Sequence, residues 1–124
     1  MIPKFRAWDK ECMEMANVTN ISYEGSWVVN EPHVSIDTRC DLLLFDEVEL
    51  MQSTGLKDKN GVEIFEGDIF QEGYATYVVC WNDKDACFSF RCPREEFILP
   101  VSMRRSMTLV GNIYENPELL EENK

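Results

Sequence analysis

The sequence predicts a mainly β protein with antiparallel pairing. Short runs rich in β-branched and aromatic residues recur along the chain, turn-forming residues separate them, and no sustained helical period of apolar residues occurs. At 124 residues and 44% apolar composition, the chain can build one core, or one core with a small satellite. We expect an N-terminal β subdomain over residues 1–50. Residues 51–124 are expected to hold a central turn motif, a small antiparallel sheet or SH3-like barrel, and a short C-terminal helix. One continuous domain is the alternative.

The first half of the chain is expected to form short strands. Residues 4–8 alternate polar and apolar side chains, which predicts a half-buried strand with Phe5 and Trp8 near the core. A hairpin should return the chain over 12–15 and on toward Val18 and Ile21. The other β-prone segments are 27–29, 34–37, 42–45, which is a strand or a short helix, and 47–52.

Two turns dominate the central stretch, residues 51–70. Asn60 and Gly61 are typical of a tight turn whose two central residues have positive φ, and Gly67 with Asp68 form a second turn before the next strand. We expect a loop and turn up to about residue 61, followed by two short strands. The residues to which we assign this architectural role are Gly55, Asp58, Asn60, Gly61, Glu66, Gly67 and Asp68.

The second half contains the clearest strand, residues 74–81, which is aromatic and β-branched throughout. Residues 87–91 are its natural antiparallel partner, because the connection is short and alternation places two phenylalanines on one face. Further strands are expected over 97–100 and 107–114, where Gly111 allows a bulge or a close approach. In the tail, Asn116 is expected to cap a short helix that begins at Pro117.

The net charge of −11 and the sequence pI of about 4.4 disfavour nonspecific binding to nucleic acid or to anionic membranes. Neither an apolar export leader nor an apolar run of membrane-spanning length is found in the sequence. We therefore expect a soluble protein of the bacterial cytoplasm that does not act at a membrane.

Cysteine and histidine usage predicts neither a disulfide framework nor a metal centre. The five cysteines are odd in number and irregularly spaced, no Cys-x-x-Cys occurs, and the single histidine is His33. We expect reduced thiols, no cofactor and a surface histidine in a polar loop. The cysteines are Cys12, Cys40, Cys80, Cys87 and Cys92.

Catalysis is not expected. Asp9, Asp58, Glu66 and Asp68 could converge on a divalent metal as in a nuclease. All four lie in predicted turns, however, where a carboxylate accepts hydrogen bonds from nearby backbone N–H groups, and this use is sufficient to explain them. A metal-dependent enzyme is therefore the least favoured function, and the interpretation we adopt is a protein that is not an enzyme.

A nucleic-acid interface is the alternative function. It would use a cationic face formed by Arg91, Arg94, Arg104 and Arg105, with aromatic side chains as a stacking platform. Packing of the aromatic side chains in a small β core is the favoured interpretation. The aromatic residues concerned are Trp8, Trp27, Tyr74, Tyr77, Trp81, Phe88 and Phe90.

Four segments carry a resemblance to a known family. They are Lys4–Lys10, Leu50–Gly61, Ile64–Ile69 and Gly111–Leu120, and their order along the chain resembles that of the YopX family of small phage and prophage proteins. The resemblance implies a mainly β fold and a phage or prophage accessory role, and it brings no established activity. We expect a non-catalytic module that binds a protein partner or itself as a homo-oligomer, through open strand edges and the apolar tail residues Leu119 and Leu120.

Overall fold

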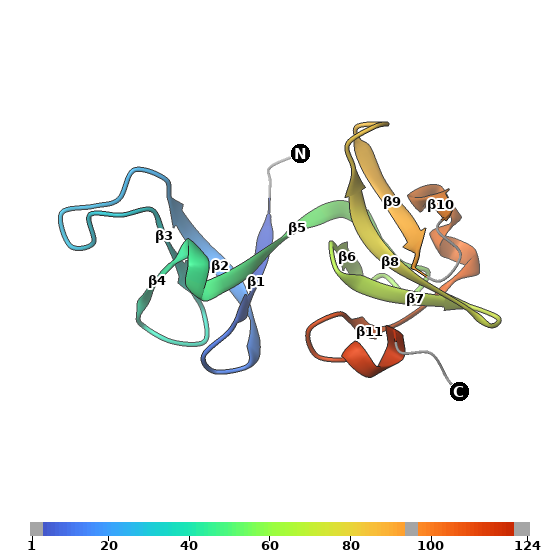
Figure 1. The fold of residues 1–124 in the computed structure, drawn as a ribbon, viewed down its shortest axis with the longest axis horizontal. Helices are drawn as coiled ribbons and strands as arrows, with labels where there is room; N and C mark the ends of the chain where they lie inside the picture. Colours follow the sequence, from blue (N-terminus) through green and yellow to red (C-terminus); the bar gives the residue numbers. More distant parts are fainter. Residues whose placement is uncertain (1–3, 94–96, 121–124) are drawn as a thin grey trace. The chain divides into compact units, whose positions relative to one another are not determined.

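The computed structural model describes residues 4–93 and 97–120 and confirms a mainly β fold with antiparallel pairing (Figure 1). The chain divides into two compact units, Met1–Gln52 and Ser53–Lys124, here called the N-terminal unit and the C-terminal unit. The sequence prediction placed the division between residues 50 and 51. None of the helices in the described residues is long and apolar enough to cross a membrane.

The N-terminal unit is an antiparallel sheet with strand order β4-β3-β2-β1-β5. The register pairs Ala7 of β1 with Ala16 of β2 on one side and with Leu50 of β5 on the other. The predicted strands over 4–8, 12–21 and 34–37 are confirmed, and segment 42–45 forms both a short strand and the start of a single 3-10 turn. The elements are β1 (Phe5–Asp9), β2 (Glu14–Ser22), β3 (His33–Ile36), β4 (Leu42–Leu44), η1 (Phe45–Glu47) and β5 (Val48–Lys57).

The core of the N-terminal unit is aliphatic. Its buried members are Ala7, Ala16, Val34, Ile36, Leu43 and Val48. Alternation along the short strands accounts for this set, because every second side chain of a strand reaches the same face of the sheet. The β-prone segment 27–29 is not a strand: it lies in the connection between β2 and β3, so the prediction for that segment is wrong.

Strand β5 runs further than the sequence suggested. It continues past Gln52 into the C-terminal unit, where it pairs with β6 (Glu63–Phe65), and the register shifts between Ser53 and Lys57. Gly55 lies inside this shift with φ of +78°, a conformation that glycine adopts without steric cost. The predicted loop over the early 50s is therefore an irregular strand.

The C-terminal unit contains a five-stranded antiparallel sheet with strand order β10-β9-β8-β7-β11 (Figure 1). Every strand predicted for this half is present. A 3-10 segment, η2 (Val101–Ser106), follows β10 and was not predicted. The strands are β7 (Asp68–Glu72), β8 (Ala75–Asn82), β9 (Cys87–Cys92), β10 (Phe97–Pro100) and β11 (Thr108–Asn112).

The core of the C-terminal unit is aromatic at its centre. The rings of Phe70 and Phe90 meet edge to face with centroids 5.1 Å apart, and Tyr77 lies 6.2 Å from Phe90. Phe70 and Phe90 are fully buried, and burial of each phenylalanine stabilises the fold by about 1.5–3 kcal/mol. Core packing is thus confirmed for Tyr77 and Phe90.

Two finer predictions for the C-terminal unit concern a barrel and a helical tail. The five strands form an open sheet with β10 and β11 at its edges, so the SH3-like barrel is not confirmed among the described strands. The tail is a single 3-10 turn, η3 (Pro117–Leu120). Asn116 Oδ1 accepts a hydrogen bond from the backbone N–H of Asn112, 3.2 Å away, so its side chain closes the preceding turn.

Gly111 confirms the expectation of a close approach. The register of β11 against β7 shifts between Leu109 and Gly111, and a Cβ at residue 111 would collide with the Asn116 side chain. A glycine is required there because the tail folds back onto the end of β11.

Candidate functional site

Two of the central carboxylates act as hydrogen-bond acceptors that close turns. Asp58 Oδ1 accepts the backbone N–H groups of Asn60 and Val62 at 2.9 and 2.8 Å, and Asp68 Oδ2 accepts that of Phe65 at 2.8 Å. Both aspartates are buried, so their lone pairs are taken up by the backbone instead of facing solvent. These contacts are the ones expected of carboxylates that close turns.

The first central turn differs from its prediction in one detail. Gly61 has φ of +82° and donates its N–H to the carbonyl of Asp58 at 3.0 Å, whereas Asn60 does not have positive φ. The predicted pair of positive-φ residues is therefore wrong for Asn60, because one left-handed residue suffices when the Asp58 side chain closes the turn. Glu66 lies half-buried in the turn between β6 and β7.

The second central turn connects distant parts of the C-terminal unit. Gly67, with φ of +85°, donates its N–H to Val79 O and accepts the N–H of Ile113, both at 2.9 Å. Asn112 in turn accepts the N–H of Glu115 at 2.9 Å through its side-chain oxygen. The central and closing motifs of the sequence thus meet through backbone hydrogen bonds.

Asp9 is the centre of a charged cluster in the N-terminal unit. Its Oδ1 accepts the backbone N–H groups of Glu11 and Cys12 at 3.1 and 3.2 Å, as expected of a turn carboxylate. Its Oδ2 forms an ion pair with Arg39 Nε at 3.1 Å, and the Asp9 side chain is only 1% exposed. Arg39 also pairs with Glu11 at 3.3 Å and with Asp41 at 3.6 Å. Three carboxylates therefore share one guanidinium.

The electrostatics of this cluster hold Arg39 in its charged form. Desolvation opposes the charge, but Asp9 and Glu11 outweigh it, and the pKa of Arg39 is raised. Desolvation and the neighbouring Asp9 carboxylate raise the pKa of the Cys12 thiol as well. A thiol with a raised pKa is a weak nucleophile at neutral pH. Sequence reasoning singled out Asp9 and missed Arg39, which stands in a short polar loop with no distinguishing pattern.

The five cysteines are unpaired in the structure, and Cys92 is buried while Cys12, Cys40 and Cys87 are exposed. Burial raises the pKa of the half-buried Cys80, against the opposing charge of Arg91. Across residues 4–93 and 97–120, no group of three or more His, Cys, Asp or Glu side chains is placed to hold a metal ion.

The described arginines of the predicted cationic face lie on two elements. Arg91 is exposed on β9, whereas Arg104 and Arg105 lie on η2, and Arg94 falls outside the described residues. Arg104 is partly buried, and its Nε donates to Lys57 O at 2.8 Å. This hydrogen bond connects η2 to the end of β5, so the Arg104 guanidinium has fewer N–H groups available to bind a phosphate group.

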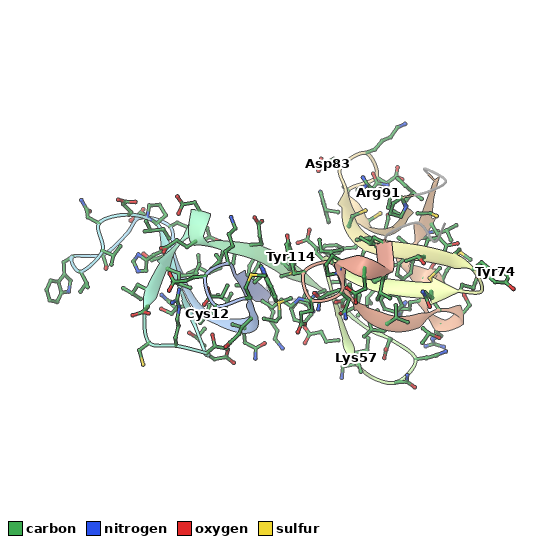
Figure 2. All side chains as sticks on the ribbon, turned by 60° about the horizontal axis from the view of Figure 1, so that its bottom comes forward. Cys12, Lys57, Tyr74, Asp83, Arg91 and Tyr114 are labelled. Atoms are coloured by element: carbon green, nitrogen blue, oxygen red, sulfur yellow. The ribbon has the colours of Figure 1, made fainter. Side chains whose placement is uncertain are left out.

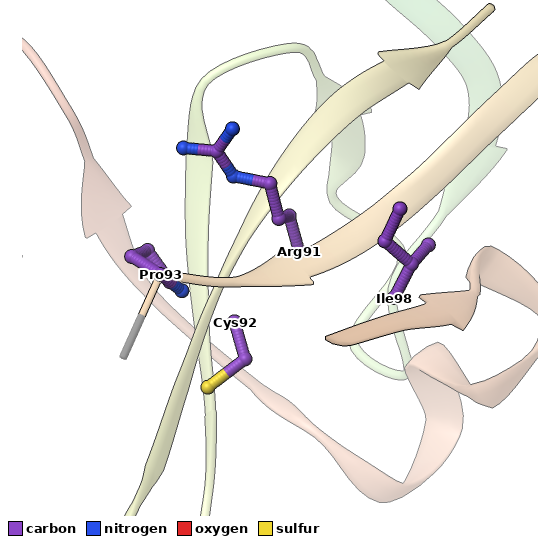
Figure 3. A pocket seen from close by; sticks show the side chains of 4 residues that line it. All are labelled: Arg91, Cys92, Pro93 and Ile98. Carbon is purple, nitrogen blue, oxygen red and sulfur yellow. The ribbon is translucent and has the colours of Figure 1, made fainter. Parts of the chain in front are cut away.

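A small pocket of about 320 Å³ lies beside Arg91 and is also lined by Cys92, Pro93 and Ile98 (Figure 3). Arg91 and Ile98 are register partners on β9 and β10, and their side chains project from one side of the strand pair while the Cys92 thiol points to the other. Arg91 is the single cation among these lining residues. A groove that tracks a nucleic-acid backbone needs a series of cations.

The aromatic residues proposed as a stacking platform are divided among different settings. Trp8 is buried in the N-terminal unit, whereas Trp81 is 46% exposed and meets Phe88 edge to face with ring centroids 5.1 Å apart. Tyr74 is fully exposed at the tip of the β7–β8 hairpin (Figure 2), and Trp27 is 96% exposed in the connection between β2 and β3. Core packing is therefore wrong for Trp27, Tyr74 and, in part, Trp81.

Two other predicted surface features prove to be partly or fully buried. His33 is 3% exposed on β3, and its Nδ1 lies 2.8 Å from the carbonyl oxygen of Glu31. The expectation of a histidine in a polar surface loop is therefore wrong, because the strand begins one residue after Pro32 and points this side chain inward. Leu119 and Leu120 are half-buried within the chain.

The connection between β2 and β3 is an ordered turn that presents apolar side chains. Ser26 N–H donates to Val29 O at 2.7 Å, and Val29 N–H donates to the Ser26 hydroxyl at 3.2 Å. Gly25 has φ of +86°, and a Cβ there would come within 2.7 Å of Glu31 N, so the two arms of the connection lie in close contact. Trp27 and Val28, which is 64% exposed, are held at the tip.

A pocket of about 480 Å³ lies next to this turn, within the N-terminal unit. Its apolar lining includes Val28, Val29 and Leu42, and its acidic lining includes Glu11, Asp41 and Glu47. We call it the N-terminal groove. The sequence did not indicate the exposed turn or the groove beside it. Tryptophan and valine are common in strands, so the Trp-Val-Val run of segment 27–29 predicted a strand there.

The chain matches the family model described as YopX protein over residues 4–121. No curated protein matches it.

Two solved structures resemble the chain over nearly its whole length. The crystal structure of protein EF1440 from Enterococcus faecalis is 34% identical in sequence, with a TM-score of 0.60 over 98% of this chain and 99% of that one. The crystal structure of protein yopX from Bacillus subtilis is 18% identical, with a TM-score of 0.55 over 98% of each chain. The second likeness concerns the fold alone.

Proposed function

This chain belongs to the YopX family, and we propose that it is a phage or prophage accessory protein of the bacterial cytoplasm that acts by binding another protein. The single observation that carries the proposal is the exposed apolar tip of the ordered turn, Trp27 and Val28. Tryptophan is enriched among residues that dominate the energy of protein interfaces. The hydrogen bonds between Ser26 and Val29 hold the backbone of this turn, so less backbone entropy is lost when the Trp27 side chain makes such a contact.

The roles of the motif residues support binding over catalysis. Asp9, Asp58, Gly67 and Asp68 each hold backbone groups in place, so these prominent residues of the sequence are accounted for by folding. The thiols of Cys12 and Cys80 have raised pKa values, which does not favour nucleophilic catalysis. The exposed Trp27 turn has no such role in folding among the contacts described above.

The test is affinity capture by the tagged full-length chain from a nuclease-treated lysate of the bacterium that carries the gene. Trp27→Ser should lose the captured partner. Tyr74→Ser is the matched control, because Tyr74 is equally exposed on a hairpin of the C-terminal unit, and it should retain the partner. Loss of the partner in both variants, or in neither, contradicts the proposal. Light scattering identifies self-association as a mass above the monomer that returns to the monomer in Trp27→Ser.

A further inference from the structure

We propose that the N-terminal groove binds a positively charged segment of the partner protein in which lysine or arginine residues flank an apolar side chain. The inference rests on the proposed function and adds the chemistry of the partner. It begins from two surfaces that meet in one place: the exposed turn with Trp27 and Val28, and the groove lined in part by that same Val28.

The apolar lining provides the place for an uncharged side chain. Val28 is exposed, and Val29 and Leu42 are half-buried, so the groove keeps aliphatic surface in contact with water. Burying that surface against an apolar side chain is favourable in proportion to the area removed from water. The volume of about 480 Å³ exceeds what a single side chain fills, which suits a segment of several residues.

The charges of the groove decide which segment fits. Arg39 is the one cation among its described lining residues, and its guanidinium already lies against Asp9, Glu11 and Asp41. Glu11 and Asp41 have side chains 75% and 71% exposed, so their remaining lone pairs face solvent. With Glu47 also in the lining, carboxylates outnumber the cation, and an anionic segment would be repelled.

A second copy of the chain is a poorer occupant than a basic segment of another protein. The net charge of −11 on each copy opposes association of two copies at low salt. A cationic segment gains from the same field, which raises its association rate. The acidic charge that disfavours nucleic acid therefore favours a cationic segment, and the carboxylates of the groove determine where it binds.

The test uses a fluorescein-labelled eight-residue peptide of alternating lysine and leucine, titrated with the full chain and followed by anisotropy. We expect binding that weakens as salt is added, and no binding of the matched peptide of alternating glutamate and leucine. The double variant Glu11→Gln, Asp41→Asn should weaken binding about tenfold, because each exposed charge contributes a factor of about two to five.

The control is Asp83→Asn, Asp85→Asn, which removes the same charge from an exposed turn of the C-terminal unit (Figure 2). It should leave the affinity unchanged. If both double variants weaken binding equally, the peptide is attracted by net charge alone and the proposed binding at the groove is wrong. Equal binding of the two peptides also overturns the proposal. Val28→Ser tests the apolar lining without altering an ion pair, and unchanged affinity in that variant also overturns the proposal.

The two proposals fail separately. If Trp27→Ser abolishes partner capture while the lysine–leucine peptide does not bind, the protein-binding function stands and the cationic segment is wrong. If the peptide binds at the groove while partner capture is independent of Trp27, the groove stands and the role assigned to the Trp27 turn is wrong.

Discussion

The two units of this chain are built around different centres. The N-terminal unit has an aliphatic core and a buried ion pair between Asp9 and Arg39, whereas the C-terminal unit has an aromatic core around Phe70 and Phe90. In the C-terminal unit the residues of the prominent sequence motifs form and close turns. The N-terminal unit has a hydrogen-bonded turn at whose tip the apolar side chains of Trp27 and Val28 are exposed. The proposed function makes this difference one between a scaffold and a recognition surface within 124 residues.

The largest expected effect sharpens the contrast between the two cores. Phe90→Ala should destabilise the C-terminal unit by about 3–5 kcal/mol, because it removes a fully buried ring and leaves a cavity. Val34→Ala, the corresponding change at a fully buried residue of the N-terminal unit, should cost about 2 kcal/mol, since it deletes fewer buried carbons. Hydrogen exchange resolved along the chain measures both. Faster exchange spread evenly over both units after Phe90→Ala would mean that the two units unfold as one.

The next effect tests the polar centre of the N-terminal unit. Arg39→Gln should destabilise that unit, because it leaves the buried Asp9 carboxylate without its cation. The loss should be smaller than that of a fully buried pair, since the Arg39 side chain is 18% exposed. Denaturant unfolding checks the loss. Adding Asp9→Asn to Arg39→Gln should restore part of the stability, and a further loss of stability would contradict the account.

A smaller effect tests the claim that the central carboxylates close turns. Asp58→Ala should cost about 1–3 kcal/mol, because the N–H groups of Asn60 and Val62 lose their acceptor. Asp58→Asn keeps an acceptor oxygen and should cost less. Thermal unfolding with and without added magnesium provides the measurement. A melting temperature that magnesium raises in the parent protein and leaves unchanged in Asp58→Asn would assign this carboxylate to metal binding.

The smallest effect concerns pH and belongs to the N-terminal unit. Hydrogen bonds from the side chain and the backbone of Asn17, both 2.9 Å long, hold the pKa of Asp37 below its ordinary value of 3.8. Because the folded pKa is lower than the unfolded one, this stabilisation is present above pH 3.8 and is lost as the pH falls through the folded pKa. Carboxyl-carbon NMR of Asp37 should show a midpoint that rises toward 3.8 in Asn17→Ala. An unchanged midpoint would assign the shift to another cause.

Much of the fold could be predicted because its strands are local and regular. The pairing of β8 with β9 follows from alternation and a short connection, and it needs no information from distant residues. The extension of β5 escaped prediction because Ser53, Thr54 and Gly55 have the composition of a turn. In the structure Thr54 Oγ1 donates to Ile64 O at 2.8 Å, a tertiary contact that keeps this polar stretch in the strand.

The candidate site was less accessible to sequence reasoning. The arginine face was inferred from clustering along the chain, but Arg104 is engaged by the carbonyl of Lys57, a residue distant in sequence. The charged cluster depends on a contact between Asp9 and Arg39, which are 30 positions apart in the chain numbering and share no pattern. Trp27 is exposed in a connection whose arms meet where Gly25 approaches Glu31, and a composition of β-prone residues does not reveal that contact.

The most direct test of the separation between scaffold and recognition surface is amide NMR of the full chain titrated with the lysine–leucine peptide. The account predicts shift changes over the Trp27 turn and the segments that carry Glu11, Asp41 and Glu47, while amides of β7, β8 and β9 stay unchanged. Shift changes centred on Arg91 and the pocket beside it, with the Trp27 turn unaffected, would contradict it.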